Sequence, residues 1–205
     1  MIRPPGFRGV AFTTAHEGDA LTTSREAISV ALGIPVQWAT VNQVHGSAIS
    51  IATIPGDLGD ADGIATRTAG LPIATFTADC FGVVLEAEGS VGVVHAGWRG
   101  TAANIVSAAV RGFRFLGDPV QRAAIGPGIQ SCCFEVGQEV AETFGEFAAT
   151  TSWQTRSVDL QTAIGSQLGE IEIWKSDACT RCGDGFHSHR GTGTDARMAA
   201  VGWLP

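Results

Sequence analysis

Two histidines and one cysteine stand out because each lies where an apolar run expected to form a strand ends. They are His45, Cys80 and His95. Strand ends are places where a rigid scaffold presents functional groups. Two imidazoles and one thiolate suit zinc, and three protein ligands leave the fourth tetrahedral position free for water or substrate. The pattern is that of a catalytic zinc centre, in which these three residues are both ligands and catalytic groups.

Other interpretations of the same residues stay open. The gaps of 35 and 15 residues are not a local zinc signature, so spacing alone favours Cys80 as a small buried hydrophobe and the histidines as core or turn residues. Cys80 could instead be a nucleophilic thiolate activated by His45 or His95, in a metal-free amidase, deamidase or peptidoglycan-precursor editing hydrolase. A non-enzymatic metal-binding module is a third alternative. Asp79 adjoins Cys80 and is a candidate for proton handling or for orienting a ligand, with turn capping as the alternative.

The glycine-rich segment Gly97-Trp98-Arg99-Gly100 is a candidate anion site. It leads into a helix expected from Thr101, so backbone N–H groups and the positive end of the helix dipole converge beside the Arg99 guanidinium. The alternative is a tight turn with Arg99 in solvent. Arg190 and Arg197 are further candidates for an anionic ligand, and are equally consistent with solvated surface groups.

A second metal candidate lies near the C-terminus, where Cys179 and Cys182 form a Cys-x-x-Cys pair followed by His187 and His189. A zinc ribbon would show a second tight pair, and a thioredoxin-like motif would open a helix, whereas Gly183 follows here. We therefore rank this pair below the first site and expect exposed loop residues with an incidental pair of thiols. The chain has five cysteines, an odd number that predicts reduced thiols rather than a disulfide framework.

Composition limits the class of protein. The chain has 205 residues, of which 44% are apolar and 16% charged, and it shows no repeat or linker, so we expect a single domain over residues 1–205. The net charge of -7 argues against a nucleic-acid partner. No apolar run reaches the roughly 18 residues of a membrane span, and the N-terminus lacks a signal-peptide pattern. We expect a soluble cytoplasmic protein without a membrane partner, and no pattern speaks for or against self-association.

Short apolar runs alternate with helical patterns, which predicts an α/β fold. The expected strands are Val10–Thr13, Thr40–Val44, Ala48–Ile51, Ile73–Thr77, Val83–Leu85, Val91–His95, Ala123–Ile125, Ile171–Trp174 and Ala199–Leu204. The expected helices are Ser24–Leu32, Thr101–Phe115, Gln138–Phe144 and Asp159–Leu168. Asp159 is expected to cap the last of these helices with its side chain, and a glycine-rich loop is expected from Gly183 to Gly193.

Several motifs together resemble one known family, the YfiH family, also called the laccase-domain or polyphenol-oxidase-like family. The resemblance runs in order from about Thr40 to the C-terminus. It rests on Asn42-Gln43-Val44-His45-Gly46, Asp62-Gly63, Thr77-Ala78-Asp79-Cys80, His95-Ala96-Gly97-Trp98-Arg99-Gly100, Gly126-Pro127, Cys132-Cys133-Phe134-Glu135-Val136-Gly137, Asp159-Leu160, Cys179-Thr180 and Phe186-His187-Ser188-His189-Arg190.

The resemblance implies a single-domain layered α-β sandwich with mixed sheets. It also implies zinc held by His45, Cys80 and His95, and phosphorolysis of purine nucleosides such as adenosine, inosine and methylthioadenosine, with adenosine deamination as a further activity. Purine nucleoside and phosphate are then the small-molecule partners. We expect the substrate and phosphate contacts to come from four side chains, namely Gln43, Arg99, Arg190 and Arg197.

The sequence departs from this family at both ends. Residues 12–18 lack the Arg-x-Gly-Gly-Val-Ser stretch, and the C-terminal Phe-Ser-Tyr-Arg-Arg element is His187-Ser188-His189-Arg190-Gly191 here. We therefore expect altered substrate contacts around an intact metal triad. Copper is a poorer expectation than zinc, because four coppers with mostly imidazole ligands would need on the order of ten histidines. This chain has five.

Overall fold

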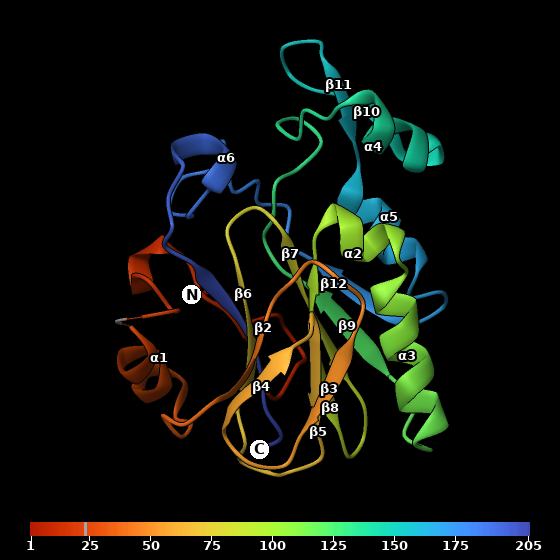
Figure 1. Cartoon of the computed structure of the whole chain (residues 1–205). Coiled ribbons are helices and arrows are strands. Elements are labelled where there is room, and N and C mark those ends of the chain that lie inside the picture. Colours follow the sequence, from red (N-terminus) through yellow and green to blue (C-terminus); the bar gives the residue numbers. More distant parts are fainter. Residues whose placement is uncertain (23) are drawn as a thin grey trace.

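The computed structural model describes residues 1–22 and 24–205 as short strands interleaved with helices (Figure 1). The strands are β1 (Val10–Phe12), β2 (Ala39–Asn42), β3 (Ile49–Ala52), β4 (Gly56–Asp60), β5 (Gly63–Thr66), β6 (Ile73–Thr77), β7 (Phe81–Glu86), β8 (Val91–Ala96), β9 (Arg122–Ile125), β10 (Ala148–Thr150), β11 (Arg156–Val158), β12 (Glu172–Lys175) and β13 (Met198–Gly202). The helices are α1 (Arg25–Leu32), α2 (Trp98–Ala102), α3 (Ile105–Phe115), α4 (Gln138–Thr143), α5 (Leu160–Ser166) and α6 (His189–Thr192), with 3-10 turns at η1 (Ala15–Glu17) and η2 (Gly145–Phe147). Within the described ranges, no helix is both long and apolar enough to cross a bilayer.

Two mixed sheets form the centre of the molecule. One has the order β1-β13-β6-β2-β4, and the other has the order β12-β9-β7-β8-β5-β3. Strands β2, β4 and β6 run parallel, while β13 lies antiparallel to β6 and β1. In the larger sheet the pairs β3-β5 and β9-β12 are parallel and the pairs between them antiparallel. A separate small hairpin pairs β10 with β11.

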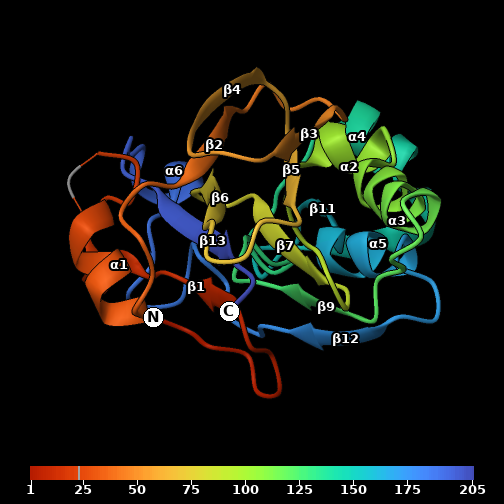
Figure 2. The same ribbon diagram turned by 90° about the horizontal axis from the view of Figure 1, so that it is seen from below.

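Apolar side chains form three layers of core. One cluster lies between the sheets and includes Ile73, Val84 and Val93. A second packs the helical layer against the larger sheet, and a third packs α1 against the smaller sheet through Ile28 and Trp38. Figure 2 shows α1 on one outer side and α3 and α5 on the other. The expected layered α-β sandwich with mixed sheets is therefore confirmed.

Most expected elements are present, with two differences near the site. The expected helix Thr101–Phe115 is two helices, because Asn104 adopts a left-handed conformation with φ 58° between α2 and α3. The first of these begins at Trp98 rather than at Thr101, which places Arg99 inside its first turn. Asp159 caps α5 as expected, since its side chain accepts a hydrogen bond from the backbone N–H of Thr162.

Other differences lie where sequence patterns are weak. Strands β4, β5, β10 and β11 were not predicted; β4 is largely exposed and β5 is a short run that begins with glycine. Within the expected loop from Gly183 to Gly193, α6 forms a single turn. Its Ser188 side chain accepts a hydrogen bond from the backbone N–H of Gly191, which is a local N-terminal cap.

Candidate metal centre

His45, Cys80 and His95 meet at one edge of the two sheets. His45 follows β2 with a left-handed φ of 59°, Cys80 directly precedes β7, and His95 is the penultimate residue of β8. Their ligand atoms all lie within 4.8 Å of one another. Cys80 Sγ lies 4.0 Å from His45 Nε2, and the two imidazole rings are 4.8 Å apart in an edge-to-face arrangement. The donor set and its compactness fit one tetrahedral zinc ion.

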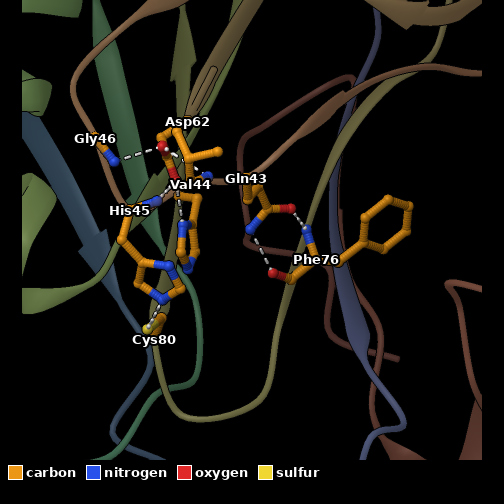
Figure 3. A network of polar contacts seen from close by, with 8 residues as sticks. Gln43, Val44, His45, Gly46, Asp62, Phe76 and Cys80 are labelled. Atoms are coloured by element: carbon orange, nitrogen blue, oxygen red, sulfur yellow. Dashed lines mark hydrogen bonds and ion pairs between the residues drawn. The ribbon is translucent and has the colours of Figure 1, made fainter. Parts of the chain in front are cut away.

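Asp62 holds two of these three residues in place. Its carboxylate is fully buried and accepts a hydrogen bond of 2.8 Å from His95 Nδ1. It also accepts the backbone N–H groups of Val44, His45 and Gly46 at 3.2, 3.0 and 2.6 Å (Figure 3). Since Nδ1 of His95 faces Asp62, Nε2 is left to act as the ligand, which is the usual arrangement of a carboxylate behind a metal-binding histidine.

The site favours charged groups despite its burial. Burial opposes the thiolate of Cys80, yet hydrogen bonds from His45 and His95 lower its pKa to about 6. Burial likewise opposes the imidazolium of His95, yet Asp62 and Cys80 raise its pKa to about 9. Burial would raise the pKa of Asp62, but His95 and the backbone of Gly46 and His45 lower it.

These shifts define a pH window for the metal-free chain. The Cys80 thiolate contributes its full stabilisation of the folded state above the ordinary thiol pKa of 9.0, and this contribution is lost as the pH falls through about 6. The His95 imidazolium contributes its full stabilisation of the folded state below the ordinary imidazole pKa of 6.5, and this contribution is lost as the pH rises through about 9. Thiolate and imidazolium therefore coexist between these two limits.

We expect iodoacetamide to alkylate Cys80 of the metal-free protein with a midpoint near pH 6, well below the ordinary thiol pKa of 9.0. Peptide mapping by mass spectrometry must separate it from Cys179. Burial opposes that second thiolate, but backbone N–H groups of Gln130, Cys182 and Arg181 lower its pKa to about 7. Zinc is expected to protect Cys80. A midpoint for Cys80 at or above the ordinary value of 9.0 would contradict this geometry.

Gly97 packs directly against the cluster. A Cβ at this position would lie 2.9 Å from Cys80 Sγ and 3.2 Å from His45 Cδ2. We expect Gly97→Ala to displace both ligands and to weaken metal binding at least about 10-fold, as changes next to a metal ligand do. Gly112→Ala is the matched control, because a Cβ there has no neighbour within 4 Å. Equal metal affinity of the two variants, measured by competition with a chelating dye, would refute the expectation.

The cluster opens into a cavity of about 780 Å³. Four arginines line this cavity, namely Arg25, Arg99, Arg190 and Arg197. Aromatic side chains line it as well, namely Phe76, Trp98 and Phe134. The Arg99 guanidinium lies 4.4 Å from the centre of the Trp98 ring. A cavity of this size suits a small molecule, and its walls offer both cationic and aromatic contacts.

The other sequence-predicted site residues also line the cavity, but their polar atoms have protein partners. Gln43 pairs with the backbone of Phe76, donating to its carbonyl at 2.8 Å and accepting from its N–H at 2.7 Å (Figure 3). Asp79 accepts the Thr180 hydroxyl at 2.8 Å and the Arg190 backbone N–H at 2.6 Å. The Arg190 guanidinium donates to the Glu135 carbonyl at 2.7 Å.

Arg197 is partly engaged in the same way. Its guanidinium donates to the carbonyl groups of Thr194 and Ala196 at 3.0 and 3.1 Å. Sequence reasoning missed Arg25, which also lines the cavity, since one arginine at the start of a helix carries no distinctive signal. Sequence reasoning also assigned no role to Asp62. The signal that could have found it is a carboxylate inside the apolar stretch Ala61–Ala65, because a buried carboxylate needs a hydrogen-bonding partner.

The Cys-x-x-Cys pair is arranged differently from our expectation. Cys179 is buried, and together with Cys182 it meets Cys132 and Cys133, not the two following histidines. His187 Nε2 lies 3.4 Å from the Gly18 carbonyl, and His189 Nδ1 lies 3.4 Å from that of Thr194. Sequence spacing could not reveal this grouping because the second pair is remote along the chain.

Comparison with known proteins identifies the family. A family model described as multi-copper polyphenol oxidoreductase laccase matches residues 9–205. The chain belongs to this laccase family. A Streptomyces coelicolor relative named purine nucleoside phosphorylase is 34% identical over 200 residues, covering 90% of this chain and 83% of its own length. A Deinococcus radiodurans relative of the same name is 35% identical over 195 residues, covering 89% and 76%.

Solved structures agree with this laccase-family assignment. YlmD from Geobacillus stearothermophilus has a TM-score of 0.81 at 29% identity, covering 100% of this chain and 89% of that one. The Bacillus licheniformis hypothetical protein YfiH has a TM-score of 0.79 at 27% identity, covering 89% and 80%. The resemblance to the YfiH family is confirmed. Among the described residues of this laccase-family chain, just two groups of three or more potential ligands occur, and neither has the imidazole-rich composition of a multicopper centre.

Proposed function

We propose that this protein is a zinc-dependent purine nucleoside phosphorylase. The observation that carries the proposal is the His45, Cys80 and His95 cluster at the wall of an arginine-lined cavity. The names of the relatives give the reaction class. When bound by these three residues, zinc supplies a Lewis acid that can orient and polarise an oxygen of phosphate or an atom of the base.

The cavity residues supply the remaining functions. Arg99 is the proposed phosphate contact, because it lies in the first turn of α2 and lines the same cavity as His95, and Arg190 and Arg197 add positive charge to this cavity. Trp98 and Phe76 offer faces for the purine. In the reaction, a phosphate oxygen bonds to C1′ as the C1′–N9 bond breaks. The purine leaves with the bonding electrons and takes up a proton.

Gln43 and Asp79 are proposed as positioning residues. Gln43 fixes the backbone of Phe76 through two hydrogen bonds. Both carboxylate oxygens of Asp79 accept hydrogen bonds from the C-terminal segment, so we assign it to holding that wall of the cavity rather than to proton handling.

Product analysis tests the proposal. The purified protein is incubated with adenosine, inosine and methylthioadenosine, with and without phosphate, and the products are separated by chromatography. We expect free base and a sugar 1-phosphate, formed only with phosphate. Free ribose without phosphate would show hydrolysis, and inosine from adenosine would show deamination. Absence of the sugar 1-phosphate under all conditions would refute phosphorolysis.

Arg99→Gln tests the proposed phosphate contact. Losing one charge-assisted hydrogen bond costs about 1.5–3 kcal/mol, so we expect the KM for phosphate to rise roughly 10- to 100-fold. Arg111→Gln is the control, because Arg111 is an exposed residue of α3 that bonds to Ser107. A phosphate KM that responds equally to both substitutions would exclude Arg99 as a specific contact.

The lowered pKa of Cys80 also fits a metal-free thiol hydrolase, in which a thiolate is paired with an imidazolium. The two functions differ in their response to metal. Removal of zinc should abolish phosphorolysis, whereas a thiol hydrolase would gain activity when zinc leaves Cys80. Activity measured before and after chelation, and again after zinc is restored, separates them.

A further inference from the structure

Four cysteines form a second compact group outside the site described above. Cys132, Cys133, Cys179 and Cys182 have all four sulfur atoms within 4.8 Å of one another. Cys132 Sγ lies 3.6 Å from Cys133 Sγ and 3.8 Å from Cys182 Sγ. The protein therefore gathers four of its five thiols at one place, and the fifth, Cys80, belongs to the other cluster.

The two separations from Cys132 Sγ match those of a tetrahedral zinc ion, and the 4.8 Å limit keeps all four sulfurs close enough to gather around one. With Zn–S bonds of about 2.3 Å, two sulfurs of a tetrahedron are about 3.8 Å apart. A disulfide would require about 2.05 Å between them. From this geometry, we propose that Cys132, Cys133, Cys179 and Cys182 bind one structural zinc ion as a tetrathiolate site, distinct from the His45, Cys80 and His95 site.

The fold builds this site at the ends of two adjacent parallel strands. Strands β9 and β12 pair in parallel, so the segments that follow them leave the same edge of the sheet. A β-bridge joins Gly128 to Cys179, and the Thr180 N–H donates to the Gly128 carbonyl at 3.0 Å. The Gln130 N–H donates to Cys179 Sγ at 3.4 Å. Backbone contacts therefore hold the two cysteine pairs in register.

The Cys-x-x-Cys turn is itself closely constrained. The Gly183 N–H donates to the Cys179 carbonyl at 2.8 Å, which closes the turn and brings the two cysteines to one side. A Cβ on Gly183 would lie 2.6 Å from that carbonyl oxygen, so only glycine fits. The site would carry a formal charge of about -2 with zinc and four thiolates. Arg181, inside the turn, donates to the Cys133 carbonyl at 3.1 Å and provides nearby positive charge.

The proposed ion would hold together the two chain segments that form one wall of the cavity. Ile129 and Phe134, which flank the first cysteine pair, line the cavity. Thr180, between the other two cysteines, bonds to Asp79. Four protein ligands leave no open position, so the role is structural rather than catalytic. This inference concerns a different metal site and does not depend on the proposed phosphorylase activity.

Metal analysis tests the inference. The untagged protein is expressed with zinc, purified without chelators, and analysed by mass spectrometry for metal per chain. We expect about two zinc ions in the wild type, about one in Cys80→Ser, and about one in the double variant Cys132→Ser, Cys182→Ser. Both substituted positions of the double variant are at least partly exposed, which favours its folding, and circular dichroism checks this.

Cobalt substitution gives a readout that needs no disruption of the cysteine cluster. In Cys80→Ser loaded with Co²⁺, we expect the intense visible absorption of tetrahedral cobalt with four thiolates. All five thiols of the wild type should also react after anaerobic purification, denaturation and chelation. The proposal would be overturned if Cys80→Ser bound no metal. It would also be overturned if the denatured wild type showed fewer than five reactive thiols because disulfides had formed.

Discussion

Cys80→Ser is expected to lose the metal at the His45, Cys80 and His95 site, and its rate of phosphorolysis should fall at least about 100-fold. Substitution of a residue that merely orients a ligand already lowers metal affinity or activity by about 10- to 100-fold. Serine keeps the size of the side chain but replaces a soft thiolate with a hydroxyl that stays protonated. Activity and metal content are measured on the same preparation, before and after added zinc.

A second ligand provides an independent arm of this test. His45 is exposed, so His45→Gln should fold and should show the same joint loss of metal and activity. His16→Gln is the matched control, since His16 is an exposed histidine outside the cluster. Full activity in Cys80→Ser or His45→Gln would remove the metal from the proposed reaction.

Asp62→Asn is expected to lower the unfolding free energy by about 2–4 kcal/mol and metal affinity by about 10- to 100-fold. An asparagine offers one acceptor oxygen and one donor NH₂ group. The NH₂ group must then face either the N–H groups of Val44 and Gly46 or the His45 N–H and the His95 Nδ1–H, and all of these are donors. The substitution therefore leaves two donors without their acceptor and loosens the hold on a ligand.

Asp118→Asn separates stability from metal binding. Asp118 is also a buried carboxylate, and it accepts the backbone N–H groups of Glu88 and Gly89 and the Ser90 hydroxyl. It lies outside both ligand clusters. We expect Asp118→Asn to lose stability, measured by denaturant unfolding, while keeping its metal affinity. If both variants keep equal metal affinity, Asp62 does not act through the ligands.

The sequence was informative where residue type and strand ends coincide. His45, Cys80 and His95 are candidates because thiol and imidazole groups follow apolar runs, although spacing alone favours core or turn residues and only the family resemblance implies a shared zinc. The structure brings the three together. Chain-local patterns could not show that the Asp62 carboxylate faces His95, because that contact depends on the pairing of β5 with β8. The four-cysteine group likewise depends on β9 lying beside β12.

The layered fold was also predictable, whereas its irregular points were not. Periodicity predicted a helix across residues 101–115, but a single left-handed residue, Asn104, divides it and shifts its start to Trp98. Asparagine tolerates that conformation better than most residues, yet it does so only where packing requires it. The positions of short exposed strands such as β4 depend on neighbours rather than on their own hydrophobicity.

The hydrogen bonds of Asp62 have a consequence for how the protein matures. One buried carboxylate already organises the backbone of residues 44–46 and the ring of His95 without any ion. Metal binding at this centre should therefore follow folding instead of driving it, whatever the four-cysteine site requires. Newly folded protein would then hold the His45, Cys80 and His95 centre assembled but inactive, and uptake of one ion there would switch it on.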